Sequence, residues 1–389
     1  MNLSFTFRKG CSRGALVGVA GLVVLASGCS RTEPEGAAAA GAVERGGQRK
    51  LVLYGMPDYF NMELLDAFHR QTGVHVDYQG YEEADEVEAR LRSNPGSVDV
   101  VIIDSFNLNK LRKLSLLHPL DKSAMPNLAH ASPKFMNLDA DPGNAYSVPY
   151  HWGTTLLAYR KDMIPRPEPS WRLLWDPSLK GQVMMMQDSF EPLAVAMLLQ
   201  GKSPSTLETA DYEAASALLL EHIHSMEARY GSDEEVREAL ADGTVAAAMC
   251  YSGDAAVVAA DNPAVDFFIP KEGASLWVDC LAIARDTKEE EAAHAFLNFF
   301  MDPKVAAENA NAIQFASTNA SADAFVDASL RDDPRLYPPP GVMERLHRVP
   351  ELDAERDSLV NKFWYTVRSE GELQNKPSKI LAQDPEPPQ

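Results

Sequence analysis

The segment GASLWVDCLAI, residues 273–283, places Trp277 and Asp279 two positions apart in an otherwise apolar run. Side chains alternate between two faces of an extended chain, so these two side chains point to the same side. A carboxylate can pair with a cationic group, and an indole face attracts a cation by about 0.5 to 2 kcal/mol. The same pattern also fits a core tryptophan beside a carboxylate that caps a turn, because isolated tryptophans are usually core residues.

A second acidic pair, Asp188 and Glu191, follows the run GQVMMMQD, which we interpret as a buried strand. Asp-x-x-Glu is also the spacing of a capping box at the start of a helix. Pro192 argues against that interpretation, because an N-cap at Asp188 would place proline at the fourth helical position, where an N–H is needed. We therefore expect both carboxylates in the loop before the helix, near a strand end where ligands commonly bind.

A third combination of an aromatic and an acidic side chain occurs in CYSGDA, residues 250–255. Tyr251 offers an aromatic face with a polar tip, and Asp254 follows three residues later. Asp254 fits a binding role and a helix N-cap equally well. This pattern alone does not decide between the two roles.

The elements that must position these side chains alternate between strand and helix. Apolar runs at 50–55, 74–81 and 98–104 have the pattern of buried strands, and helical patterns cover 62–73 and 84–94. This alternation predicts an α/β fold with a parallel sheet. About 340 structured residues exceed the usual size of one domain, so we expect two α/β lobes.

The N-terminal segment indicates an extracytoplasmic protein. Basic residues precede the uncharged apolar stretch 14–26, which is short for a membrane span and typical of a cleaved signal peptide. The following LASGCS resembles the lipobox of bacterial lipoproteins, which implies cleavage after residue 28 and lipidation of Cys29. An ordinary cleaved signal is the alternative. Residues 29–49 are expected to form a tether and residues 374–389 a disordered tail.

Composition excludes several classes of function. The formal net charge of −20 disfavours binding to nucleic acid and favours cations. Cys250 and Cys280 lack the spacing of a metal site, so neither a metal nor another cofactor is expected. Each of these cysteines neighbours a candidate site residue, so we expect them close together behind the site. An oxidising compartment would then permit a disulfide between them.

The order of motifs resembles the spermidine/putrescine-binding proteins of bacterial ABC transporters. The most specific segments are PYHWGT and PKEGASLWVDCLAI, and LYGMPDYF, DVVIIDS, AMCYSGDAA and NFFMDPKVAAENA occur around them in the same order. The resemblance covers roughly residues 50–320. It implies the α/β, two-lobed periplasmic-binding-protein (type II) fold with a hinge between the lobes. The implied first lobe is 50–150 plus 279–325, and the implied second lobe is 151–278 plus 326–373.

The resemblance also implies a function and a site. The chain would be a lipid-anchored substrate-binding protein of an ABC importer, a monomer that captures a polyamine or related amine and delivers it to a membrane permease. Buried ammonium groups need carboxylates, and the methylene chain needs flat apolar surface. The implied ligand-binding residues are Trp277, Asp279, Asp188, Glu191, Tyr251, Asp254, Tyr59, Met56, Asp58, Asp104, Phe106 and Phe315.

The first-lobe half of this site departs from the family. Met56 stands where the family has tryptophan, Pro57 replaces a hydroxyl residue, and Phe315 stands where the family has tyrosine. The segment IDSF adds a possible carboxylate at Asp104. Methionine covers an aliphatic chain but offers no cation–π face. A cationic ligand is still implied, but its identity is left open.

Other functions remain as alternatives. An enzyme could use Asp188 and Glu191, or Asp254 and Asp279, as an acid/base pair on a glycoside, but no motif supplies a nucleophile, so no enzyme is expected. Relatives of the fold bind Fe(III) through adjacent tyrosines, which are absent here; the nearest pair is WY at 364–365. Thiamine or another small solute, and a sensor or scaffold lipoprotein without transport, are further alternatives.

Overall fold

The computed structural model describes residues 49–81, 84–350 and 354–375 of the chain. The expected signal peptide, the lipidation site at Cys29, nearly all of the expected tether and the tail beyond residue 375 lie outside these ranges. Within the described ranges, no helix combines the length and the apolar character needed to cross a bilayer.

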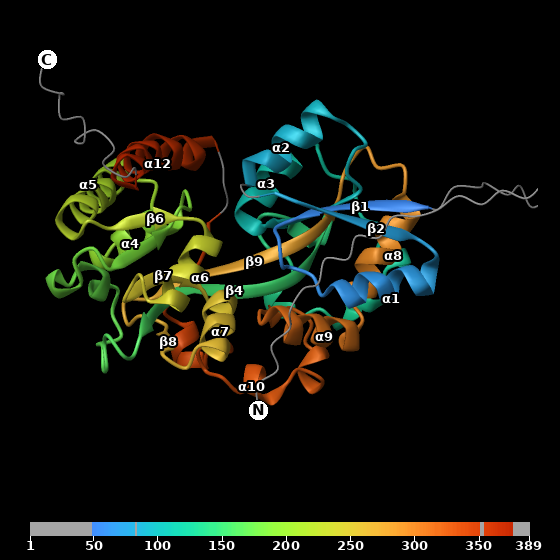
Figure 1. Cartoon of the computed structure of the whole chain (residues 1–389). Coiled ribbons are helices and arrows are strands. Elements are labelled where there is room, and N and C mark those ends of the chain that lie inside the picture. Colours follow the sequence, from blue (N-terminus) through green and yellow to red (C-terminus); the bar gives the residue numbers. More distant parts are fainter. Residues whose placement is uncertain (1–48, 82–83, 351–353, 376–389) are drawn as a thin grey trace, which may run out of the picture. The chain divides into compact units, whose positions relative to one another are not determined.

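The first strands and helices form where the apolar patterns predict them (Figure 1). A cap fixes each end of the first helix: the Asn61 side chain accepts a hydrogen bond from the Glu63 N–H, and Gly73 adopts a φ of 72°, which suits glycine. The first strand pairs in parallel with the second and the third, as expected for alternating strands and helices. These elements are β1 (Lys50–Gly55), α1 (Met62–Thr72), β2 (His75–Gly80), α2 (Ala84–Ser93) and β3 (Val100–Asp104).

The main sheet has the strand order β2-β1-β3-β9-β4-β7-β5-β6. We refer to β1–β3 with α1–α3 as the first lobe and to β5–β7 with α4–α7 as the second lobe. The strands not yet given are β4 (Ser147–Arg160), β5 (Val183–Met186), β6 (Arg229–Gly231), β7 (Ala247–Tyr251), β8 (Val265–Phe268), β9 (Ala274–Ile283), β10 (Ala316–Ser317) and β11 (Leu346–Arg348).

Two long strands, β4 and β9, connect the lobes and lie side by side (Figure 1). From Ser147 to Thr154, β4 pairs with β9, and from Thr155 onward it pairs with β7 of the second lobe. The other edge of β9 pairs with β3 from Asp279 to the end of the strand. Each strand therefore belongs to both lobes, which is the arrangement of a hinge.

Helices pack on the sheet through large apolar cores, three of which are extensive; the third includes Val101 of β3, Leu108 of α3 and Cys280 of β9. The second-lobe core is built on β4, β5 and β7 with α4 and α5, and the first-lobe core gathers Phe60, Phe68, Phe296 and Phe300 around β1. The remaining helices are α3 (Ser105–Lys113), α4 (Glu191–Leu199), α5 (Thr209–Met226), α6 (Asp233–Asp242), α7 (Ser252–Asp261), α8 (Glu290–Phe300), α9 (Pro303–Ile313), α10 (Ala328–Arg331), α11 (Pro340–Met343) and α12 (Ala354–Asn375).

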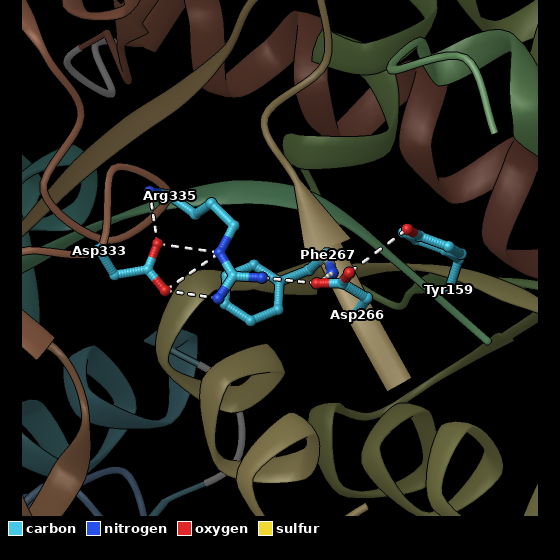
Figure 2. A network of polar contacts seen from close by, with 5 residues as sticks. All are labelled: Tyr159, Asp266, Phe267, Asp333 and Arg335. Atoms are coloured by element: carbon cyan, nitrogen blue, oxygen red, sulfur yellow. Dashed lines mark hydrogen bonds and ion pairs between the residues drawn. The ribbon is translucent and has the colours of Figure 1, made fainter. Parts of the chain in front are cut away.

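Arg335 fastens the segment before α11 to β8 (Figure 2). Its guanidinium contacts Asp333 and, at 2.5 Å, Asp266 of β8, and it lies 3.9 Å from the centroid of the Phe267 ring. The Tyr159 hydroxyl donates to the other oxygen of Asp266. This network joins β4 and β8 to the segment between α10 and α11.

The expected proximity of Cys250 and Cys280 is wrong. Both cysteines are buried and unpaired, and they belong to different cores. Cys250 lies opposite Leu156 of β4, and Cys280 lies opposite Pro149 of the same strand. Seven residues of extended chain separate those partners by about 23 Å, so no disulfide can join the cysteines. The prediction failed because sequence alone did not reveal that the two strands pair with distant parts of β4.

Candidate ligand-binding site

A cavity of ≈ 250 Å³ lies between the two lobes. It lies at the ends of β1, β3, β5 and β7 and against the middle of β9, and one face of α12 also lines it. Three residues of the predicted site do not line this cavity: Phe315, Asp254 and Asp58. The predicted residues that do are Met56, Tyr59, Asp104, Phe106, Asp188, Glu191, Tyr251, Trp277 and Asp279.

Trp277 and Asp279 lie on the same face of β9, as their spacing predicts, and both line the cavity while remaining almost fully buried. Trp277 lies directly opposite Gly153 of β4. A Cβ atom at Gly153 would lie 2.4 Å from Cζ2 of the indole, so only glycine lets the ring rest against the strand. The sequence analysis did not assign a role to Gly153, although this residue is the glycine of the PYHWGT segment.

The aromatic residues form one cluster around Trp277. Tyr251 and Phe315 approach the indole with ring centroids 5.5 and 5.2 Å away, both edge-on. Phe315 lies behind Trp277 rather than in the cavity, and a Cβ atom at Gly253 would lie 2.4 Å from its ring. Its contribution to a site is therefore to hold the indole in place.

Asp104 and Asp279 lie opposite each other on β3 and β9. The Asp104 side chain also caps α3, because it accepts a hydrogen bond of 2.8 Å from the Asn107 N–H. Burial, followed by the neighbouring Asp104 charge, raises the pKa of Asp279 well above its ordinary value. Burial likewise raises the pKa of Asp104. Because the Asp104 charge opposes ionisation of the buried Asp279, a nearby cation favours the form in which both carboxyl groups are ionised.

Asp188 and Glu191 supply a second acidic pair from the second lobe. Oδ1 of Asp188 accepts 2.7 Å hydrogen bonds from the N–H groups of Phe190 and Glu191. Asp188 precedes α4, as predicted. Glu191, however, is the first residue of the helix rather than part of the loop, with Pro192 in its first turn. Proline needs no N–H at this position, so the helix begins three residues after Asp188.

Glu191 is buried, and its Oε2 atom has no hydrogen-bond partner among the described residues. Burial, and then the charge of Asp188, raises the pKa of Glu191 to about 8. The hydroxyl groups of Ser275 and Thr155 offset part of this shift. A buried carboxyl group with an unused oxygen is ready to accept a cationic donor.

Asp254 and Asp58 are instead joined by an arginine of the second lobe. Arg237 of α6 lies 3.3 Å from Oδ1 of Asp254 and 3.6 Å from Oδ2 of Asp58. Asp254 lies in the first turn of α7, whose N-cap is Tyr251, and it does not line the cavity. It is therefore neither the helix N-cap nor a cavity-lining residue, the two roles predicted for it. No sequence signal links Arg237 to these residues, because they come from three distant segments.

The cavity is strongly acidic. Among its lining residues, Arg368 is the only lysine or arginine, whereas the carboxylates are Asp85, Asp104, Asp188, Glu191, Asp279 and Asp357. Sequence reasoning missed α12, which contributes Trp364 and Asp357 to the wall. Within the described ranges, His, Cys, Asp and Glu side chains form no group of three suited to a metal ion. Carboxylates beside aromatic faces can bind an organic cation and cover its apolar chain.

Comparison with known proteins supports the resemblance. The family of bacterial extracellular solute-binding proteins matches residues 63–338. A putrescine-binding periplasmic protein of Pseudomonas aeruginosa is 32% identical over 355 residues, which cover 85% of this chain and 95% of that protein. The spermidine/putrescine-binding periplasmic protein of Escherichia coli is 31% identical over 290 residues, which cover 74% of this chain and 83% of that protein.

Solved structures confirm the expected fold class. A putative spermidine/putrescine ABC transporter from Listeria monocytogenes matches with a TM-score of 0.77 and 29% identity, over 82% of this chain and 99% of that chain. A spermidine/putrescine ABC transporter substrate-binding protein from Streptococcus pneumoniae matches with a TM-score of 0.73 and 26% identity, over 83% and 99% of the respective chains. The chain therefore belongs to the family of bacterial extracellular solute-binding proteins.

Proposed function

We propose that this protein is the substrate-binding protein of an ABC importer and captures a polyamine or a related cationic amine in the cavity between its lobes. The observation that carries the proposal is the set of four carboxyl groups, Asp104, Asp188, Glu191 and Asp279, around one aromatic-lined cavity. Burial is the first cause of the raised pKa of each. The curated relatives named above are putrescine- and spermidine-binding proteins.

Each part of the ligand has a proposed partner. One ammonium group pairs with Asp279 and Asp104, and a second pairs with Asp188 and Glu191. Trp277, Tyr251, Tyr59, Met56 and Phe106 cover the methylene chain. Asp254 and Asp58 share one cationic partner, Arg237, and do not line the cavity, so they influence the electrostatic potential around the site without contacting the ligand directly.

The remaining parts of the proposal follow from the sequence and the relatives. The mature protein is anchored through Cys29 in a bacterial envelope membrane, acts as a monomer outside the cytoplasm and delivers its ligand to a membrane permease. We infer that it binds its ligand without catalysis, because ammonium binding accounts for the carboxyl groups of the cavity and the curated relatives named above are binding proteins. Nucleic acid is not a partner of so acidic a chain.

A thermal-shift panel tests the ligand class. Putrescine, cadaverine, spermidine, agmatine and thiamine are added to the purified protein, with a sugar and a ferric salt as comparisons. An amine at 100 times its dissociation constant is expected to raise the free energy of unfolding by about 2.7 kcal/mol, which is visible as a higher Tm. A shift with the sugar or the ferric salt, and none with any amine, would contradict the proposal.

Amine binding is expected to release protons and to strengthen as the pH rises towards about 8. Burial and the Asp188 charge raise the pKa of Glu191 to about 8, and an ammonium group favours the ionised carboxylate. Below that pH the affinity should rise by up to about tenfold per pH unit for each proton released. Calorimetry at pH 7 in two buffers of different ionisation enthalpy counts the protons. Glu191→Gln should reduce the number of protons released on binding. An affinity that does not change between pH 6 and pH 8 would contradict the prediction.

A further inference from the structure

His151 of β4 is a buried side chain that the proposed site does not yet use. It lies opposite Asp279 in the register of β4 and β9, and its side chain is almost completely inaccessible. Its Nδ1 atom lies 3.5 Å from Oδ2 of Asp279. Neither ring nitrogen has a hydrogen-bond partner among the described residues. A buried polar group without a partner is costly, so such a group in a binding site points to a use there.

Packing fixes the plane of the His151 ring. Phe315 stacks on it with ring centroids 5.3 Å apart and planes inclined by 16°, and the Tyr59 ring meets it edge-on at 4.8 Å. Tyr150 contacts it from the neighbouring position at 4.8 Å. The imidazole therefore cannot turn away from Asp279 without displacing several aromatic side chains.

The strand register places three polar groups in one row. Asp104 of β3, Asp279 of β9 and His151 of β4 are successive partners across adjacent strands. Asp279 thus has a carboxyl group on one side and an imidazole on the other. An ionised Asp104 can only accept hydrogen bonds, whereas a neutral imidazole can donate an N–H.

We propose that His151 is a positioning residue for Asp279, and that in the amine complex its neutral ring donates the Nδ1–H to Oδ2 of Asp279. The other carboxylate oxygen is then left to accept a hydrogen bond from the ammonium group. This inference rests on the proposed function. The distance of 3.5 Å is long for a hydrogen bond, and such contacts commonly shorten when a ligand binds.

The electrostatic surroundings agree with a neutral donor. Burial lowers the pKa of His151 to about 3, so the ring remains uncharged in the physiological range. Titratable groups that interact with His151 or Asp279 among the described residues include Asp104 and three tyrosines, Tyr59, Tyr81 and Tyr150. Burial raises the pKa of all three tyrosines well above the ordinary value, so they stay protonated. Asp104 opposes ionisation of Asp279, which makes a donor on the opposite side more valuable.

Two substitutions separate positioning from packing. His151→Phe keeps an aromatic ring against Phe315 but removes the donor, whereas His151→Asn keeps an N–H donor near the position of Nδ1. Putrescine and spermidine affinities are measured by calorimetry from pH 6 to 9. His151→Phe is expected to weaken binding by about 10- to 100-fold and to move its pH dependence upward by about one unit. His151→Asn should bind within about threefold of wild type.

The outcomes are distinguishable. Equal losses in both variants, or wild-type affinity and pH dependence in His151→Phe, would overturn the positioning role. If the wild-type protein binds no amine at all, the proposed function fails instead. A second measurement observes the ring itself: in the putrescine complex of ¹⁵N-histidine-labelled wild-type protein, the His151 resonance, assigned by its absence from His151→Asn, should be that of a neutral ring protonated at Nδ1. A ring protonated at Nε2, or at both nitrogens, would also overturn the inference.

Discussion

Replacing Asp279 by asparagine is expected to abolish amine binding without harming the unliganded protein. The substitution removes the carboxylate that pairs with the ammonium group, and loss of one partner of a buried ion pair costs about 3 to 5 kcal/mol, or more than 100-fold in affinity. The pKa of Asp279 is raised because its charged form is disfavoured by burial and by Asp104. Asparagine carries no charge, so the unliganded variant should unfold at the wild-type temperature or slightly above it.

Thermal unfolding with and without putrescine measures both effects. Asp139→Asn is the matched control: it makes the same chemical change at an exposed carboxylate outside the cavity, and should leave affinity and Tm unchanged. A large fall in the Tm of unliganded Asp279→Asn would show that the carboxylate is a structural group. Binding at the wild-type level would show that Asp279 does not contact the ligand.

Gly153→Ala is expected to weaken amine binding and to destabilise the protein, although the change adds only one methyl group. The new Cβ atom would lie 2.4 and 2.6 Å from two indole carbons of Trp277 and 2.8 Å from Oγ of Ser252. The indole must move away from β4, into the cavity that the ligand occupies. Overpacking of this kind costs about 1 to 3 kcal/mol of stability, and we expect a loss of affinity of at least about tenfold.

A control and a second-site change test this explanation. Gly341→Ala adds the same methyl group where no atom lies within 4 Å, so it should change neither stability nor affinity by a measurable amount. Trp277→Leu removes the indole part of the clash, so Gly153→Ala should cost less stability in the Trp277→Leu background than in the wild-type protein. If Gly153→Ala costs the same in both backgrounds, the steric explanation is wrong.

Local patterns were enough to predict the elements and the central part of the site. The alternation of strands and helices predicted β1 to β3, and the two-residue spacing of Trp277 and Asp279 correctly placed them on one face. Pro192 showed that Asp188 precedes α4. Each of these features depends on neighbours within a few residues, so the sequence carries it directly.

Features set by long-range pairing were missed. Arg237 neutralises Asp254 only because α6, α7 and the loop after β1 meet in three dimensions. Trp364 was considered only as part of a pair with Tyr365, because nothing in the sequence indicates that α12 reaches the cavity. The predicted proximity of Cys250 and Cys280 was wrong for the same reason. Their strands pair with different parts of β4, a difference that neither flanking sequence contains.

The position of Asp279 on a strand shared by both lobes has a kinetic consequence. Asp279 lies where β9 is bonded to β3 on one side and to β4 on the other, and we expect the lobes to turn about these shared strands. Points near a pivot travel little, whereas Asp188 and Glu191, at the start of α4, travel further. We therefore expect the first ammonium group to dock at Asp279 while the protein is open. The carboxylates of Asp188 and Glu191 then reach the second ammonium group as the lobes close. Capture therefore has two stages, and the first stage needs no movement of the lobes.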